Sequence, residues 1–197
     1  MKPTYNNFEA KKSGGYIELP PVGAYIAEIQ DVRVAKNEKT GRDIIELMIE
    51  ITEGEYKNRY HDVYDDQSER FGKATYKGTF RLTPYVSGDE DWVRNKFEGN
   101  LWCVQESNPG YKWDWDEKKL KGKKVGINVR KRLYTYNGKN RETTEIGQFE
   151  TIADVKAGKV KQLKDRDNRE NKTESAETDG SDFTDVSKDV EVPFPTW

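Results

Sequence analysis

The chain has 197 residues and a formal net charge of −2, with 33% hydrophobic and 36% charged residues and a mean hydropathy of −1.06. So polar a chain leaves no run of about 20 apolar residues for a transmembrane helix, and part of it is not expected to pack into a core. With only Cys103 and only His61, the sequence excludes an internal disulfide and argues against a His/Cys zinc site.

Residues 21–163 are predicted to form one β-rich domain, preceded by an extension over residues 1–20. Two runs typical of strands, 24–34 and 43–52, lie on either side of a polar turn. Every other residue of the second run is apolar, as in a strand with one buried face: Ile45, Leu47, Ile49 and Ile51.

A third strand is predicted over residues 56–65, with Tyr60 and Tyr64 on one face. Residues 79–82 favour a short further strand, although glycines and a proline around them interrupt any regular pattern. Apolar residues at spacings of four, four and three then predict a helix from about residue 90 to 106: Val93, Phe97, Leu101 and Val104.

The clearest strand covers residues 125–136 and is predicted to form a hairpin with residues 141–152. Asn137-Gly138 between them is a strong hairpin signal, because a type I′ turn requires positive φ at both positions. The expected fold class is therefore all-β with one helix: a five-stranded OB-fold barrel with the helix between strands three and four. An SH3-like barrel or a small sandwich has similar runs and stays an alternative.

The small net charge hides a separation along the chain. Residues 173–197 hold seven acidic residues and one lysine, a charge of −6, which leaves 33 basic and 29 acidic residues, or +4, for the rest. Within that rest, residues 117–142 hold ten Lys or Arg and two Glu, or +8. This asymmetry indicates a basic binding surface and an acidic arm.

The polar side of strand 125–136 carries guanidinium and phenol groups about 6.6 to 7 Å apart, close to the nucleotide spacing of an extended single strand. Rings stack on bases and cations neutralise phosphates, so this face is interpreted as a nucleic-acid interface. For any single residue a structural role is the alternative, since cross-strand pairing also favours Tyr and Arg. The predicted contact residues are Arg130, Arg132, Tyr134, Tyr136, Lys139, Arg141 and Lys123, with Lys36 and Arg42 on the first turn and Tyr60 and Tyr64 on the third strand.

A second aromatic cluster follows the predicted helix and contains Tyr111, Trp113 and Trp115. Such rings either form a stacking or carbohydrate site or clamp a loop onto the barrel. The clamp is the favoured interpretation.

Residues 164–197 are predicted to be a disordered acidic tail, because residues 164–190 are polar and lack apolar periodicity. The last residues differ and form an apolar tip. We expect this tip to be a recognition segment that orders on binding a partner, since an unfolded end gains nothing from exposed Phe and Trp. The predicted partner-binding residues are Asp189, Glu191, Pro193, Phe194 and Trp197.

Three segments resemble the single-stranded DNA-binding proteins of phages and mobile elements of Gram-positive bacteria: PVGAYIAEIQDV, KTGRDIIELMIEITEGEYKNR and LKGKKVGINVRKRLYTYNGK. The resemblance implies an OB-fold that binds single-stranded DNA during replication or recombination of the element. The tail is similar to that of bacterial single-stranded DNA-binding proteins, whose acidic arm ends in Pro-Phe. Here Pro193 and Phe194 match that pattern, but Pro195, Thr196 and Trp197 follow them.

We therefore expect a non-enzymatic, cytoplasmic protein, without cofactor, metal or membrane contact, that binds single-stranded DNA and recruits replication or recombination proteins through its tip. The opposite charges also predict that the acidic arm folds over the basic hairpin and competes with DNA. An exposed strand edge could pair with a second copy of the chain, so a homo-oligomer stays an alternative. The alternatives are an adaptor barrel that binds protein or carbohydrate, and a metal-dependent nuclease built on Asp62, Asp65, Asp66 and Glu69.

Overall fold

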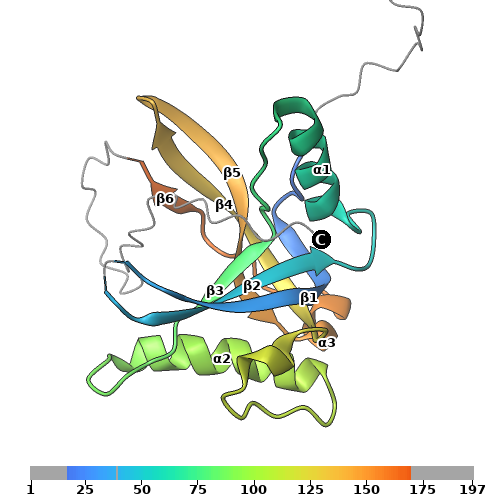
Figure 1. The fold of residues 1–197 in the computed structure, drawn as a ribbon. Helices are drawn as coiled ribbons and strands as arrows, with labels where there is room; N and C mark the ends of the chain where they lie inside the picture. The colour runs from blue at the N-terminus through green and yellow to red at the C-terminus, as the bar shows by residue number, and fades with distance from the viewer. Residues whose placement is uncertain (1–16, 39, 170–197) are drawn as a thin grey trace, which may run out of the picture.

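The computed structural model describes residues 17–38 and 40–169, which form a six-stranded sheet with three α-helices (Figure 1). The elements in chain order are β1 (Gly23–Lys36), β2 (Asp43–Ile51), α1 (Arg59–Phe71), β3 (Thr79–Leu82), α2 (Asp91–Ser107), the 3₁₀ turn η1 (Glu117–Leu120), β4 (Lys124–Tyr136), β5 (Lys139–Glu150), α3 (Ile152–Lys156) and β6 (Arg166–Asn168). The mainly β architecture is thus confirmed, with two more helices than expected. None of the helices in this described part is long and apolar enough to cross a membrane.

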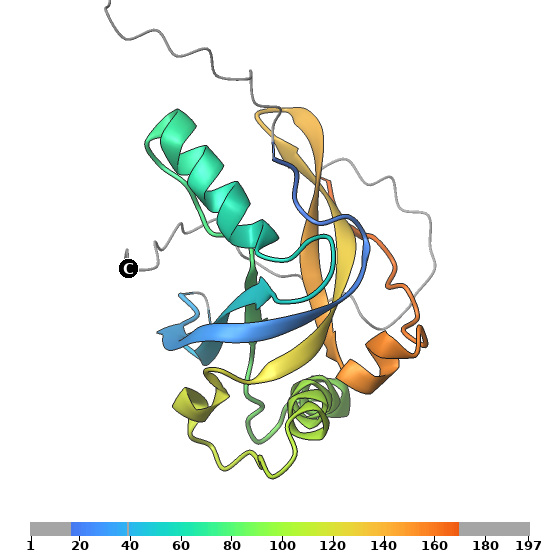
Figure 2. The ribbon, with the colours of Figure 1, turned by 90° about the vertical axis from the view of Figure 1, so that its right-hand side faces the viewer.

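The sheet has the strand order β3-β2-β1-β4-β5, with every pair along this path antiparallel. β1 is long enough to serve two neighbours, since it pairs with β2 and, through Gly23–Glu28, with the first half of β4. The second half of β4 extends beyond β1, and there β6 pairs in parallel with the edge of β4 that β1 leaves unpaired. The outer half of β4 therefore has a neighbour on each side (Figure 2).

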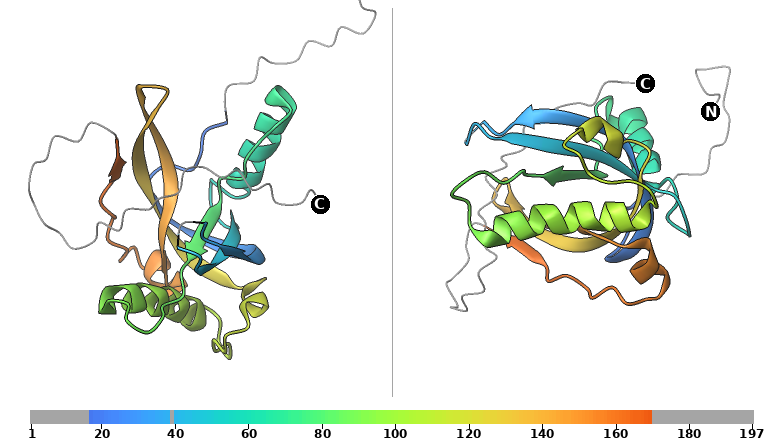
Figure 3. Two further views of the ribbon diagram at one scale, coloured as in Figure 1. Left: turned by 60° about the vertical axis from the view of Figure 1, so that its left-hand side comes forward. Right: turned by 90° about the horizontal axis from the view of Figure 1, so that it is seen from below.

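The core lies between the sheet and α2, which runs along one side of the strands (Figure 3). Phe97, Leu101 and Val104 of α2 are buried, which confirms the helix predicted for about 90–106. The rings of Phe80 on β3 and Phe149 on β5 lie 4.6 Å apart between their centroids. Burying side chains of this size contributes about 1.5–3 kcal/mol each, so this packing holds the sheet and helix together.

The prediction of one buried face for β2 is wrong, because both faces are buried from Ile44 to Ile51. Glu46 on the second face is 2.5 Å from Arg33 on β1 and 2.8 Å from Arg81 on β3. A buried carboxylate is tolerated where cations pair with it. Glu46, one of the charged residues that marked this face as exposed, is instead neutralised by arginines on both neighbouring strands.

The strand predicted over residues 56–65 is also wrong, because the chain enters α1 at Arg59. The buried carboxylate of Glu50 on β2 accepts hydrogen bonds from the backbone N–H groups of Tyr60 (3.2 Å) and His61 (2.8 Å). A carboxylate in this position satisfies the N–H groups that a helix start leaves without partners. Tyr60 and Val63, three residues apart, lie on one face of the helix. The strand prediction missed this spacing because it assigned Tyr60 and Tyr64 to one face of a strand.

The disorder predicted from Lys164 is wrong for the first residues of that segment, because Arg166–Asn168 form strand β6. The residues before β6 lie against β4: Asn128 Nδ2 donates to the Lys161 carbonyl at 3.0 Å. Gly147 on β5 allows this approach, since a Cβ there would lie 2.5 Å from Leu163 Cδ1. The rest of the predicted tail, 170–197, lies outside the described residues, as does most of the N-terminal extension.

Candidate nucleic-acid interface

β4 and β5 form the predicted hairpin, paired from Gly126 opposite Glu150 to Tyr136 opposite Lys139. The turn has φ of 50° at Asn137 and 68° at Gly138, so both positions take the positive φ that the sequence signal predicts. The tip of this hairpin and helix α2 lie at opposite ends of the molecule (Figures 1 and 2).

Six of the predicted contact residues share one face of this hairpin. Directly paired residues of antiparallel strands point to the same side of a sheet. The register places Arg132 opposite Thr143, and it places the two outer pairs on the same face as Arg130: Tyr134 opposite Arg141, and Tyr136 opposite Lys139.

The inner part of this face is a cluster of arginines around Glu145. Arg130 Nη2 is 2.9 Å from Glu145 Oε1, Arg166 Nη1 is 3.6 Å from the same oxygen, and Arg132 Nε is 3.9 Å from Oε2. Arg130 and Arg132 share this one carboxylate, so their two guanidiniums leave an excess of positive charge here. Arginine clusters of this kind favour binding of a phosphate or carboxylate.

The outer part of the face is the more open one. Tyr136 is 60% exposed, and Lys139 and Arg141 are also exposed. The guanidinium of Arg132 lies over the ring of Tyr134, 5.7 Å from its centroid. By contrast the side chains of Arg130 and Arg132 are only about a quarter exposed, at 25% and 26%. The solvent-facing track is therefore shorter than predicted and runs from Tyr134 to the turn.

The other basic residues predicted for the interface lie elsewhere. The Lys123 amine lies 4.9 Å from the Tyr111 ring centroid, and it precedes Tyr134 by eleven residues, on the order of 35 Å of strand. Lys36 ends β1 and Arg42 directly precedes β2. The turn between these two strands lies away from the hairpin tip (Figure 2). Arg42 forms a bidentate pair with Asp89, with a 3.0 Å hydrogen bond from Nη1, and this pairing lowers the pKa of that carboxyl.

The predicted aromatic contacts from residues 56–65 are not at the interface. Tyr60 is 2% exposed, so its ring offers no face on which a base could stack. Tyr64 is half-buried on α1, with its ring centroid 6.1 Å from that of Tyr76. The predicted contacts of Tyr60 and Tyr64 depended on a strand, and both residues lie on helix α1 instead.

The carboxylates proposed for a nuclease lie along α1. Asp66 accepts a hydrogen bond from Arg70 Nε at 2.7 Å, as a surface pair one helical turn apart. Among the residues that the structure describes, no three His, Cys, Asp or Glu side chains gather as metal ligands.

A polar cluster at the base of α1 was not predicted from the sequence. Besides the backbone of α1, the Glu50 carboxylate accepts a hydrogen bond from the Tyr76 hydroxyl at 2.8 Å, and His61 Nδ1 lies 2.5 Å from it. Burial and the charge of Glu50 raise the pKa of Tyr76, so the phenol stays protonated and donates to the carboxylate. This cluster fixes α1 to β2 and is a structural one.

Two residues of the arginine cluster were also missed, Glu145 and Arg166. Arg166 lies in a segment without apolar periodicity, and only the pairing of β6 with β4 brings it to the hairpin. For Glu145 the sequence contained a weak signal: the pairing of its strand with residues 125–136 was predicted, but the residue opposite Glu145 was not. The two-residue turn Asn137-Gly138 sets the register of the two strands, because the pairing is uninterrupted from Tyr136 opposite Lys139 to Arg130 opposite Glu145.

Neither a scan against protein-family models nor a search of curated proteins found a match to this chain. The functional inference therefore rests on the geometry of the hairpin and its charges.

Proposed function

We propose that this protein binds single-stranded DNA without sequence preference through the face of the β4–β5 hairpin. The observation that carries this proposal is the cluster in which Arg130, Arg132 and Arg166 approach the single carboxylate of Glu145. Tyr134 and Tyr136 continue the same face toward the turn. Cations bind phosphates while rings stack on bases, a combination that suits an unpaired strand because its bases are accessible.

We also propose that the sheet is an OB-fold barrel. The strand order β3-β2-β1-β4-β5, with α2 between β3 and β4, supports this assignment, as does the contact between Phe80 and Phe149 at the two ends of that order. In such a barrel the loops after strands one and four frame the oligonucleotide. Lys36 and Arg42 flank the first of these loops and would then contact DNA beyond the hairpin.

The biological setting that we propose is replication or recombination, as the resemblance to phage and mobile-element proteins implies. The C-terminal tip, residues 192–197, would recruit partner proteins of those processes.

The test is binding of the full chain to labelled oligo-dT, oligo-rU and duplex DNA, measured by fluorescence anisotropy between about 50 and 300 mM salt. Affinity for oligo-dT should exceed that for duplex and fall steeply with salt. A Tyr134→Ala/Tyr136→Ala variant should lose at least about tenfold in affinity, because each stacked base contributes about 1–3 kcal/mol. A Lys139→Ala/Arg141→Ala variant should lower the salt slope by about 1.4.

The matched control is Lys112→Ala/Lys118→Ala, which removes the same charge from exposed positions at the other end of β4. It should change affinity much less than the hairpin variants. Hairpin variants that bind like the unmodified chain, or a control that loses as much, would contradict the proposed site. A chain that binds no oligonucleotide at about 50 mM salt would instead favour the adaptor barrel.

A further inference from the structure

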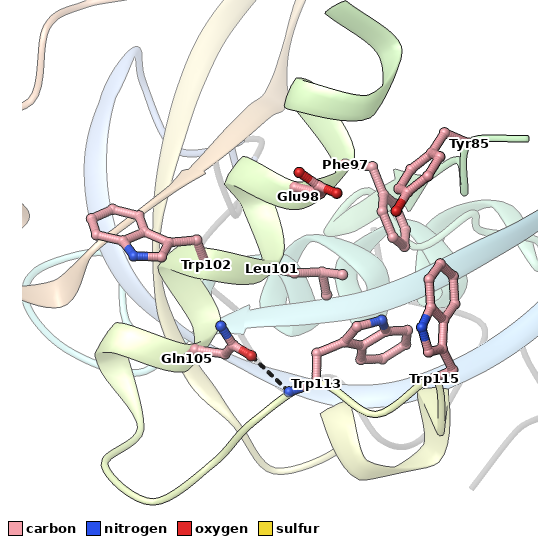
Figure 4. Close-up of a pocket in the computed structure, with 8 residues that line it drawn as sticks. All are labelled: Tyr85, Phe97, Glu98, Leu101, Trp102, Gln105, Trp113 and Trp115. Carbon is pink, nitrogen blue, oxygen red and sulfur yellow. Dashed lines mark hydrogen bonds between the residues drawn. The ribbon is translucent and has the colours of Figure 1, made fainter. Parts of the chain in front are cut away.

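An aromatic pocket of about 260 Å³ lies on α2, at the opposite end of the molecule from the hairpin tip (Figure 4). Its walls come from the loop before α2, from α2 itself and from the loop that follows, and its aromatic and apolar lining is Tyr85, Phe97, Leu101, Trp102, Trp113 and Trp115. This volume is below that of sites for drug-sized ligands and suits one or two side chains.

Two of the pocket's tryptophans contribute little to the core. Trp102 is 52% exposed and Trp115 is 59% exposed. Trp115 also has φ of 67°, a left-handed conformation that costs a bulky residue on the order of 1–2 kcal/mol. In this conformation its ring stacks on Phe97, with centroids 5.8 Å apart and an angle of 22° between the planes. Exposed rings held at such a cost indicate a surface that binds an apolar partner.

Trp113 adds a hydrogen-bond donor beside these rings. Its backbone N–H donates to Gln105 Oε1 at 2.7 Å, whereas its indole nitrogen is buried and has no hydrogen-bond partner among the described residues. Figure 4 shows this indole nitrogen on the side of the ring that faces Trp115. A carbonyl oxygen of a bound peptide would supply the acceptor that the indole lacks once the Trp115 ring moves aside.

The charges around the pocket are largely paired with one another. Arg94 donates to Glu98 at 2.8 Å and lies over the Tyr85 ring, 5.4 Å from its centroid. Lys119 lies 2.5 Å from Asp114. Such a neutral rim does not attract a phosphate backbone, so the pocket is separate from the proposed DNA track and suits an uncharged apolar segment.

We propose that the occupant of this pocket is residues 192–197 of the same chain, Val-Pro-Phe-Pro-Thr-Trp. Pro-rich segments bind aromatic-lined grooves, because their carbonyls accept hydrogen bonds and their prolines limit the conformational entropy lost on binding. The tip is thereby stored on α2 until a partner competes for it. This docking does not depend on DNA binding.

The chain beyond the described residues is long enough to reach the pocket. The 28 residues after Arg169 span about 90 Å when extended and have a root-mean-square length of about 30 Å. A domain of this size is about 30–40 Å across, so the tip reaches any point on its surface. At such lengths the effective concentration of a tethered segment is in the millimolar range.

The first test is a ¹⁵N NMR spectrum of the tryptophan indole N–H groups in the full chain. The chain has five Trp and therefore five such signals. A Phe194→Ala variant should shift the signals of Trp113 and Trp115, while the signal of Trp92, which is outside the pocket and bonded to Glu90, stays in place. The matched control is Phe183→Ala, which removes the same side chain from the same tail and should move none of them.

The second test is release of Trp197 from the full chain by carboxypeptidase. Docking with a dissociation constant of about 0.1 mM at a millimolar effective concentration slows release about tenfold. The protection should disappear in a Trp102→Ala/Trp115→Gly variant, which keeps its fold because glycine adopts positive φ without strain. A thermal melt and the Trp92 signal report whether that variant is folded.

Indole signals that are the same in the Phe194→Ala variant and the unmodified chain would overturn the proposal, and so would equal release rates. Shifts that grow with protein concentration would overturn docking within one chain, because they indicate the tip of a second copy. Neither test contains DNA, so its failure leaves the proposed DNA-binding function standing.

Discussion

Glu145 is the residue that sets how much positive charge the hairpin presents. It accepts a hydrogen bond from Arg130 Nε at 2.9 Å and is the one carboxylate that Arg130, Arg132 and Arg166 all approach. Without it the three guanidiniums would repel one another on folding. With it they are held in place, and Arg130 and Arg132, which share this carboxylate, still carry an excess of charge.

Glu145 both positions the arginines and neutralises part of their charge, and replacing its carboxylate by an amide separates these two effects. In a Glu145→Gln variant the affinity for oligo-dT at about 50 mM salt should rise several-fold, because one negative charge is removed beside the track while an acceptor oxygen remains. Stability should fall by about 1 kcal/mol at most, as the arginines are partly solvated. Anisotropy and thermal melts measure the two effects.

The control for this change is Glu142→Gln, on the opposite face of β5. Glu142 is an exposed residue whose Oε2 lies 3.2 Å from Lys131. Its loss should change DNA affinity less than the loss of Glu145. An unchanged or weaker affinity of Glu145→Gln would show that the arginine cluster does not contact DNA.

At the scale of elements, the start of helix α1 depends on a single side chain of strand β2, Glu50. Glu50 receives hydrogen bonds from the backbone N–H groups of Tyr60 and His61 and from the Tyr76 hydroxyl, all in a buried site. Asn58 at the helix start makes no side-chain capping hydrogen bond of its own. The helix is therefore capped by tertiary structure and not by its own sequence.

Removing this acceptor should destabilise the fold markedly. A Glu50→Ala variant leaves the backbone N–H groups of Tyr60 and His61 without their acceptor, while the Tyr76 hydroxyl keeps the Ile49 carbonyl at 2.9 Å. We expect a loss of about 2–4 kcal/mol in the free energy of unfolding. Urea unfolding followed by circular dichroism measures this loss. Glu53→Ala, an exposed glutamate three residues away, should cost less than about 0.5 kcal/mol. Equal stabilities of the two variants would refute the capping role.

At the scale of the whole molecule, the acidic arm begins beside the proposed DNA site. β6 pairs Asn168 with Tyr134, so the chain leaves the described region next to the hairpin face. The last 25 residues carry −6 against +8 for residues 117–142. Opposite charges on a short tether compete with DNA phosphates for the same cations.

Deleting residues 173–197 should therefore raise the affinity for oligo-dT at about 50 mM salt, and the gain should shrink at about 300 mM as the charges are screened. Anisotropy titrations at the two salt concentrations measure it. Phe194→Ala is the control, since it releases the tip without changing the charge of the arm. If the deletion leaves affinity at low salt unchanged, the arm does not compete with DNA.

Local signals predicted several elements well. The hairpin followed from Asn137-Gly138 between two alternating runs, and α2 followed from the spacing of Phe97, Leu101 and Val104. Both patterns are read within one segment, because a turn conformation or one face of a helix depends on residues close in sequence. For the aromatic cluster at Trp113 and Trp115, the sequence favoured a role in holding the loop against the domain. It did not predict that the same rings also line an open pocket.

The sequence by itself determined the mainly β character, the hairpin, α2 and the separation of basic body from acidic arm, because each depends on short-range periodicity or on counting charges. Only the tertiary structure decided that residues 59–71 form a helix, since the cap comes from Glu50 on β2. It also decided that Arg166 joins the hairpin, through a strand of three residues. Such long-range pairing leaves no periodic pattern, because its partners are distant in the chain.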